Sequence, residues 1–438
     1  MKKLLTLMFI AGLSVSGLVA CGNEDTETPE TETPDTETPE TENGGDEEAE
    51  GEKEPVTLKV WLDDDAWAEA IVPAIEEALP HITIEYEKVG AVDARAKLEL
   101  DGPAGLGADI FLQPHDGMSP AIESQILLPI GDELETMVSD KFLEGSVETV
   151  TSADAMYGVP LTTESLAFFY NKTLLEDNGL ELATTFEEVI EQAGTFNDPA
   201  NNKFVFRFQP ANAYDAHYLM TAAGYELFGP DGADAAAVNF TTPEFVAGLE
   251  NLKSLKEILP VPSADLNGDT VNVEFEKGTV PYIITGPWSI AAVKAGAEEN
   301  GFEFGVTKIP TLNGVQPETF SGNIIACISA YTKEADAARE VVEFLASPEG
   351  LQVTYDITGK IPALKDNSVI TGVLEDPYVA GILEQAAFSS SMPLIPEMSN
   401  YWVPAATAFG SVWDGLATPQ EAADKAMDDY EAASAMTE

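Results

Sequence analysis

Apolar and polar residues follow two different periods in the segment that begins at residue 56. Apolar residues alternate with polar ones over 56–60 and again over 82–86, which predicts two strands. Between them apolar residues recur at helical spacing over 70–78, and this helix is expected to end before Pro80. A second helix and a short apolar run at 109–112 follow. This order predicts the α/β class with a largely parallel sheet.

The middle and the end of the chain continue this mixture of helices and strands. Residues 184–187 have capping-box spacing, and 242–244 read Thr-Pro-Glu, so each predicts the start of a helix. Residues 280–285 predict a buried strand that ends at a Gly-Pro pair. Residues 418–421 predict the cap of the last helix.

The first residues form a targeting segment. Lys2 and Lys3 precede an apolar run, 4–20, which is shorter than the ~20 apolar residues that a membrane-spanning helix needs. The run ends in small residues before Cys21. This pattern resembles the lipobox of bacterial lipoproteins. The resemblance implies that residues 1–20 are a signal peptide and that Cys21 carries the lipid. An ordinary signal peptide with an incidental cysteine is the alternative.

Residues 21–55 predict a disordered acidic tether behind the anchor. Thr, Glu and Pro repeat with a period of five over 26–42, without aromatic or branched aliphatic residues. Such a segment cannot bury a core that offsets its ordering entropy, and its like charges and prolines keep it extended. We interpret it as a spacer, with a specific binding motif as the alternative.

The charge of the chain excludes several classes of partner. The chain has 77 acids and 21 bases, and residues 56–438 alone keep a net charge of −44. Nucleic acid and an anionic membrane surface are therefore not expected as partners, and an anionic ligand is disfavoured. A solvated surface suited to a saline or alkaline habitat explains the acids. The length of 56–438 predicts two lobes.

No catalytic motif is found. The three histidines form no paired metal motif, and nucleophile-elbow, Walker and dinucleotide fingerprints are absent. Besides Cys21 the chain has only Cys327, in the apolar stretch 323–328, where it is expected to be a small core residue. The sequence therefore predicts no enzyme, no disulfide framework, no zinc site and no cofactor.

One segment has the spacing of a calcium-binding loop. Asp265, Asn267, Asp269 and Glu276 occupy ligand positions of such a loop, but Thr270 stands where the sharp turn needs glycine. We interpret the segment as a polar loop that caps a helix, and predict no metal.

Acids and aromatic residues occur together next to the predicted strands. A sugar offers hydroxyl groups at its edges and apolar ring faces, so its site needs acceptors and aromatic plates. In α/β folds such sites lie at strand ends. The candidates there are Asp65, Trp67, Asp116, Glu164, Trp288 and Trp402. Taken singly, each aromatic could be core and each acid solvated surface.

Three motifs resemble a known family. Residues 158–172 look like the first crossover between the lobes of ABC-transporter extracellular sugar-binding proteins. Residues 275–278 and 285–288 match a helix–strand pair of that family. Residues 392–402 look like the maltose/maltodextrin-binding branch.

The resemblance implies a monomeric, two-lobed periplasmic-binding-protein-like fold with crossover strands and a ligand cleft between the lobes. One lobe would comprise 56–164 and about 307–365, the other about 165–306 and 366–438. The protein would be held on the extracellular face of the cell membrane by its lipid alone. It would bind a maltodextrin-type oligosaccharide and deliver it to ABC permease subunits.

The resemblance also implies roles for single residues. Acceptors for sugar hydroxyls would come from Asp65 and Asp116 in the first lobe and from Glu164 in the crossover. The second lobe would supply aromatic plates, and His217 falls where the family often has another aromatic residue. The plates would be Tyr214, Trp288 and Trp402.

The sequence departs from the best-known maltose binder at several of these positions. Ala66 and Gly117 stand where that protein has a lysine and an arginine, Gln113 lies near a missing aromatic, and 403–406 is apolar instead of containing a basic residue. Fewer donors imply a more open site, which suits a longer or cyclic α-glucan or another neutral oligosaccharide.

Two other classes of function stay open at this stage. A secreted glycoside hydrolase could use Asp116 and Glu164 as its two carboxylates, although nothing in the sequence sets their separation. A surface adhesin or signalling receptor could use the same fold.

Overall fold

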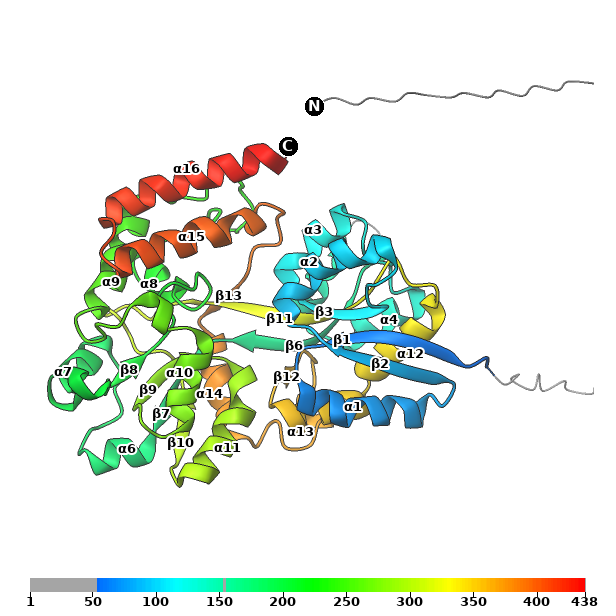
Figure 1. The fold of residues 1–438 in the computed structure, drawn as a ribbon, viewed down its shortest axis with the longest axis horizontal. Helices are drawn as coiled ribbons and strands as arrows, with labels where there is room; N and C mark the ends of the chain where they lie inside the picture. Colours follow the sequence, from blue (N-terminus) through cyan, green and yellow to red (C-terminus); the bar gives the residue numbers. More distant parts are fainter. Residues whose placement is uncertain (1–52, 153–154, 438) are drawn as a thin grey trace, which may run out of the picture. The chain divides into compact units, whose positions relative to one another are not determined.

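The computed structural model describes residues 53–152 and 155–437, and residues 53–438 form one compact unit. The predicted signal peptide, Cys21 and most of the predicted tether lie outside the described residues. Within the described part, one sheet has seven strands and another has four (Figure 1). No helix there is both long and apolar enough to cross a membrane.

The seven-stranded sheet contains the strands predicted at the start of the folded chain. Its order is β12-β6-β11-β3-β1-β2, and β13 pairs with β11. The strands are β1 (Val56–Leu62), β2 (Ile82–Lys88), β3 (Ile110–Pro114), β6 (Val159–Ser165), β11 (Thr319–Ile328), β12 (Ile361–Pro362) and β13 (Ser389–Ser391).

This sheet is mixed, so the prediction of a largely parallel sheet is wrong. Strand β1 runs parallel to β2 and β3, but β11 runs antiparallel to both β3 and β6. The physical reason is the path of the chain. Strand β6 leads out of this sheet toward the four-stranded sheet, and β11 returns from it, so the two neighbours run in opposite directions.

The four-stranded sheet begins directly after β6, since only Leu166 separates β6 from β7. Its order is β10-β7-β9-β8. The strands are β7 (Ala167–Asn171), β8 (Phe206–Arg207), β9 (Tyr282–Thr285) and β10 (Phe304–Thr307). A separate two-stranded pair is formed by β4 (Thr151–Ser152) and β5 (Ala155–Met156). The sheets thus follow the two-lobe organisation, while the exact lobe boundaries stay a prediction.

Helices cover the sheets and bury their apolar stripes. Around the first sheet, α1, α12 and α13 contact one another and α2 packs on β3 (Figure 1). These and their neighbours are α1 (Asp65–Ala78), α2 (Ala91–Asp101), α3 (Met118–Glu123), α4 (Asp132–Lys141), α5 (Glu144–Glu148), α12 (Ala335–Leu345) and α13 (Pro348–Thr358).

A second group of helices packs around the four-stranded sheet and beside it. Helix α14 contacts β10, α10 contacts β9, and α15 and α16 lie side by side against α9 (Figure 1). The group comprises α6 (Lys172–Asp177), α7 (Phe186–Phe196), α8 (His217–Thr221), α9 (Pro243–Leu255), α10 (Gly268–Glu276), α11 (Ile290–Asn300), α14 (Pro377–Ala386), α15 (Met398–Trp413) and α16 (Pro419–Thr437).

The predicted caps of α9 and α16 are confirmed. The Thr242 side chain accepts from the N–H of Phe245, and Thr418 and Glu421 bond each other's backbone N–H. The capping box of α7 begins one residue later than predicted.

In α7 the box joins Thr185 and Glu188 rather than the residues at 184 and 187. This start turns Phe186, Val189 and Ala193 toward the core, where all three are buried. Burial of the apolar stripe therefore fixes the register that two adjacent threonines leave open.

The calcium-like segment is a helix-capping loop, as interpreted from the sequence. The Asn267 side chain accepts from the N–H of Thr270 and caps α10. Cys327 is a fully buried free thiol on β11, which confirms its assignment to the core.

Candidate functional site

Three consecutive acids, 63–65, follow β1, and their carboxylates serve different purposes. The Asp64 side chain caps the first turn of α1, at 2.7 Å from a backbone nitrogen. The exposed Asp65 carboxylate accepts from the Tyr86 hydroxyl and the Lys88 ammonium on β2, both at 2.7 Å. Asp65 is thus paired with β2 and not with another predicted site residue; its role in ligand binding stays a prediction.

The remaining acid of this run, Asp63, pairs with a distant lysine. Its Oδ2 lies 2.7 Å from Nζ of Lys360, which directly precedes β12. Lys360 is only 7% exposed. The pair is therefore partly desolvated, and its attraction is stronger than that of a surface ion pair.

Glu164 lies near the end of β6, beside this ion pair. Its carboxylate is half-buried, and no hydrogen bond joins it to another described residue. Burial raises the pKa of Glu164 to about 7; the ammonium of Lys360 opposes that shift and the charge of Asp63 adds to it. Glu164 therefore offers a carboxylate whose acceptors are free for a ligand.

Asp116 lies in the short helix η2 (His115–Gly117), which a buried histidine holds in place. His115 Nδ1 accepts from the N–H of Asn323 on β11 at 3.0 Å, so Nε2 carries the proton and donates to the carbonyl of Met392 at 3.1 Å. Burial lowers the pKa of His115, although Asp116 opposes the shift. The neutral ring ties the Asp116 turn to two other segments.

Asp116 and Trp402 are in direct contact. Trp402 Nε1 on α15 donates to Asp116 Oδ2 at 3.0 Å. The sequence analysis selected both residues, and the hydrogen bond brings them together across 286 positions of sequence.

Three half-buried aromatic side chains form a group near Phe320 of β11: Tyr214 and Trp402 pack against Phe320, and Trp288 lies beside Tyr214. The ring centroid of Tyr214 lies 6.3 Å from that of Trp288 and 6.0 Å from that of Phe320. Trp402 packs edge-on against Phe320 at 5.8 Å. Burial and the nearby carboxylates, Glu164 first among them, raise the pKa of Tyr214 well above its ordinary value. The predicted plates therefore share a neighbourhood with the predicted acids.

Two predicted site residues lie in the core. Trp67 is 2% exposed, and its Nε1 has no hydrogen-bond partner among the described residues. His217 is 3% exposed, stacks on Phe320 at 3.7 Å, and its Nδ1 lies 3.2 Å from the Tyr401 hydroxyl. Burial lowers the pKa of His217 to about 3, so the ring is neutral. We therefore treat His217 as support beneath the plates, and contact of either residue with ligand stays a prediction.

The arrangement suits an uncharged, polyhydroxylated ligand with apolar faces. Glu164 and Asp116 supply acceptors, and Tyr214, Trp288 and Trp402 supply apolar plates. Sequence reasoning noted Asp63 as part of the acidic run that follows the first strand, but it missed Lys360 and Phe320. No local pattern marks these two residues, because both reach this region through the topology of the sheet.

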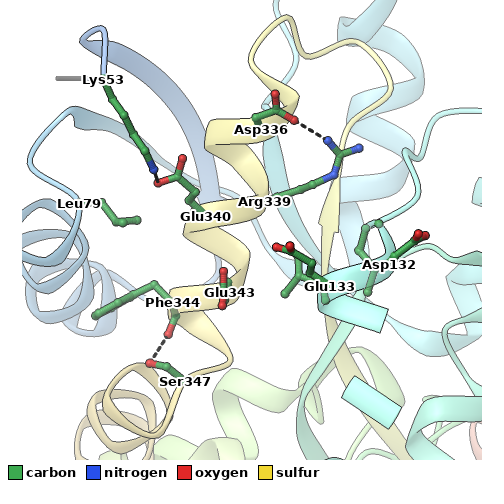
Figure 2. Close-up of a pocket in the computed structure, with 13 residues that line it drawn as sticks. Lys53, Leu79, Asp132, Glu133, Asp336, Arg339, Glu340, Glu343, Phe344 and Ser347 are labelled. Atoms are coloured by element: carbon green, nitrogen blue, oxygen red, sulfur yellow. Dashed lines mark hydrogen bonds and ion pairs between the residues drawn. The ribbon is translucent and has the colours of Figure 1, made fainter. Parts of the chain in front are cut away.

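A pocket lies elsewhere, between α12 and the start of α4 (Figure 2). It has a volume of about 710 Å³, and none of the predicted site residues lines it. Ion pairs of Lys53 with Glu340 and of Arg339 with Asp336, both at 2.8 Å, lie at its walls. Its other charged lining residues are acids, and we assign no ligand to it.

Known proteins provide the context for this site. A model of the bacterial extracellular solute-binding protein family matches residues 60–352. The galactooligosaccharide-binding protein of Bacillus subtilis (strain 168) is 28% identical over 336 residues, which cover 75% of this chain and 77% of that protein. The maltooligosaccharide ABC transporter solute-binding lipoprotein of Streptococcus pneumoniae (strain R6) is 28% identical over 387 residues, which cover 86% of this chain and 88% of that protein.

Among solved structures, a cyclo/maltodextrin-binding protein complexed with maltotetraose is similar to this chain. The sequence identity is 31% and the TM-score is 0.68, with coverage of 87% of this chain and 98% of that one. This likeness confirms the two-lobed α/β fold expected from the sequence.

Proposed function

This chain belongs to the bacterial extracellular solute-binding protein family, and we propose that it is the receptor of an ABC sugar importer that binds maltodextrin-type oligosaccharides. Because the family consists of solute-binding proteins, the chain is not an enzyme, and the hydrolase alternative is set aside. The proposed ligand site is the region around Glu164, Asp116, Tyr214, Trp288 and Trp402.

The observation that carries this proposal is the grouping of carboxylate acceptors with aromatic plates. Trp402 contacts both Asp116 and Phe320, and Tyr214 lies beside Trp288 and close to the charge of Glu164. Carboxylates accept from hydroxyls and indole rings cover apolar sugar faces, so the set fits a neutral sugar. The names of the relatives support the same class of ligand, both as maltooligosaccharides and as galactooligosaccharides.

The proposed mechanism is closure of the two lobes around the ligand. The residues of the site come from different elements: η2, the end of β6, the turn after β9 and α15. A sugar that contacts all of them favours the closed arrangement through its differential affinity, and permease subunits read that arrangement. Lipidation at Cys21 and the acidic tether would keep the receptor at the extracellular face of the membrane.

Calorimetric titration tests the proposal directly. Purified protein is titrated with maltotriose, longer maltodextrins, cyclodextrins and galacto-oligosaccharides, while tryptophan fluorescence is followed. We expect heat and a fluorescence change with an α-glucan, because Trp288 and Trp402 would leave a polar surrounding on binding. Binding of galacto-oligosaccharides alone would contradict the maltodextrin assignment, and no binding of any sugar would overturn the receptor proposal.

A further inference from the structure

Lys360 is a buried cation that has no role in the proposed ligand site as described so far. It follows Gly359, whose left-handed backbone (φ 71°) ends α13, and it precedes β12. Its Nζ lies 2.7 Å from Asp63 Oδ2, and the two residues are 297 positions apart. Burying an ammonium group is costly unless it is paired, so a lysine at this position requires a specific role or partner.

The register of the sheet places Lys360 opposite Glu164. Strands β12 and β6 are antiparallel, with Ile361 opposite Thr163 and Pro362 opposite Thr162. The next positions in this register are Lys360 and Glu164. Residues that oppose each other in an antiparallel pair project to the same face, so the ammonium and the carboxylate share one side of the sheet.

The backbone before Lys360 also adjoins the turn that carries Trp288. A Cβ atom on Gly359 would lie 3.2 Å from the Ile290 side chain and 4.0 Å from the carbonyl oxygen of Pro287. Pro287 directly precedes Trp288 in the chain, and Ile290 follows it by two residues. The Lys360 ammonium thus lies beside the acid after β1 and acts on the acid at the end of β6, while Gly359, the residue before it, packs against the turn that carries Trp288.

We propose that Lys360 is a positioning residue of the ligand site, whose ammonium group fixes the Asp63 carboxylate and faces Glu164, so that sugar affinity depends on this cation. The inference rests on the proposed function, because it concerns the same site. It also supplies the basic group that the sequence lacks at Ala66 and Gly117, from an element far away in the chain.

The unpaired atoms around Lys360 support a role beyond stability. Asp63 Oδ1 is buried without a hydrogen-bond partner among the described residues, and the Glu164 carboxylate is not hydrogen-bonded there either. A purely structural ion pair would satisfy the remaining acceptors, since unpaired buried acceptors cost free energy. The half-buried Glu164 carboxylate, held beside a cation, is instead available to ligand hydroxyls.

Several charged or titratable groups act on Glu164 and Lys360. Burial opposes the charge of Lys360, but Asp63, Glu164 and Asp64 outweigh it, and the pKa of Lys360 is raised above its ordinary value. The charge of Glu164 raises the pKa of Tyr214, and the charges of Asp215 and Asp116 act in the same direction. His115 lies close to Gly322, the β11 partner of Glu164, and is neutral.

The sign of the pH dependence follows from these groups. Lys360 stays protonated through the neutral range, whereas Glu164 titrates with a pKa of about 7. Ionised Glu164 is the better acceptor, so sugar affinity is expected to rise with pH through about 7. Removing the Lys360 charge removes the group that lowers this pKa, so the midpoint of the affinity profile moves to higher pH.

The test compares sugar affinity across pH in the full folded chain and its variants. Lys360→Met keeps the length of the side chain without its charge, and Lys360→Arg keeps the charge. Maltotriose and a longer maltodextrin are titrated by calorimetry from about pH 5.5 to about pH 8.5, a window that spans the Glu164 transition. We expect Lys360→Met to weaken binding about tenfold at neutral pH and to move the midpoint upward. Lys360→Arg should leave the midpoint unchanged.

Lys360→Met leaves Asp63 without its counter-charge and could lower stability, so the double variant Asp63→Asn/Lys360→Met serves as a second test. It removes both charges of the pair, and weakened binding in a folded double variant supports the proposal. Affinity and a pH midpoint equal to those of the parent in a folded Lys360→Met or double variant would overturn it. If the parent itself binds no sugar, the proposed function fails instead, so the two failures are distinguishable.

Discussion

Trp402 combines two contacts that a ligand would change. Its indole nitrogen donates to Asp116, and its ring packs against Phe320. A sugar hydroxyl that bonds Asp116 would compete with the indole N–H for the same carboxylate. Trp402 can therefore contribute to ligand affinity through its ring, while its hydrogen bond to Asp116 has to be shared or broken when a sugar binds.

Trp402→Ala is expected to weaken maltodextrin binding by about 1–3 kcal/mol, by analogy with the stacking of nucleic-acid bases on aromatic side chains. Trp402→Phe keeps a plate but removes the N–H donor, so its loss should be smaller. Calorimetry measures affinity, and chemical denaturation measures the free energy of unfolding. Trp413→Phe is the matched control, because Trp413 is buried and its Nε1 bonds the carbonyl of Val261; it should lower stability and leave affinity intact. An unchanged affinity in Trp402→Ala would make Trp402 a structural residue.

His217 shows that a residue at a position typical of ligand contact can be buried. The sequence presents a polar aromatic ring at a position typical of ligand contact, yet the ring stacks on Phe320 within the core. The local sequence around one histidine cannot distinguish a ligand-contacting ring from a buried one, because the difference depends on which distant segments pack beside the ring.

At the scale of elements, two helix glycines differ in how closely other parts of the molecule approach them. Gly381 in α14 has the carbonyl oxygen of Val306 on β10 where a methyl group would stand. Gly194 in α7 faces open space, with no atom within 4 Å of that position. A glycine is therefore needed for close packing at position 381, whereas a larger residue fits at position 194.

Gly381→Ala is expected to lower the free energy of unfolding by about 1–3 kcal/mol, because α14 must move away from β10. Gly194→Ala, the matched control, should raise it by about 0.5–1 kcal/mol, since alanine favours the helix and restricts the unfolded chain. Urea denaturation of both variants measures the difference. Equal effects of the two substitutions would mean that α14 and β10 are not in close contact.

The elements also show where sequence patterns lose precision. Local patterns predicted the strands β1, β2, β3 and β9, the caps of α9 and α16 and the loop before α10. The predicted start of α7 differs from the observed one by one residue, because only the burial of Phe186 selects Thr185 over Thr184 as the cap.

At the scale of the whole molecule, the excess of acids dominates the electrostatics. The chain has a net charge of −56, and most ion pairs among the described residues are at least partly exposed, with Lys88–Asp65 and Lys425–Asp429 among the most exposed. Exposed pairs contribute about 0–1 kcal/mol each, whereas repulsion among the many unpaired acids acts over the entire surface. Repulsion is therefore the larger effect.

Salt is consequently expected to stabilise the protein. Raising sodium chloride from about 0.02 M to about 0.5 M shortens the screening length and should raise the melting temperature. Thermal unfolding followed by circular dichroism measures the shift, and potassium chloride should give the same result because screening depends on ionic strength. A melting temperature that falls with salt would mean that the ion pairs outweigh the repulsion.

The sequence by itself determined the features that depend on neighbours a few residues apart. Periodicity indicated strands over 56–60 and 82–86, which are part of β1 and β2, and it indicated the first helix; the order of elements indicated the α/β class, and three motifs indicated the family. The acids Asp116 and Glu164 and the aromatic residue Trp288 were likewise visible, because each lies at or next to the end of a strand.

Only the tertiary structure decided which of these residues meet. The antiparallel return of β11, the pairing of Lys360 with Asp63 and the contact of Trp402 with Asp116 join segments that are far apart in the chain. Such contacts depend on the path between the two sheets, which local periodicity does not encode. The same long-range packing buried His217 and supplied, through Lys360, the cation that the local motifs lacked.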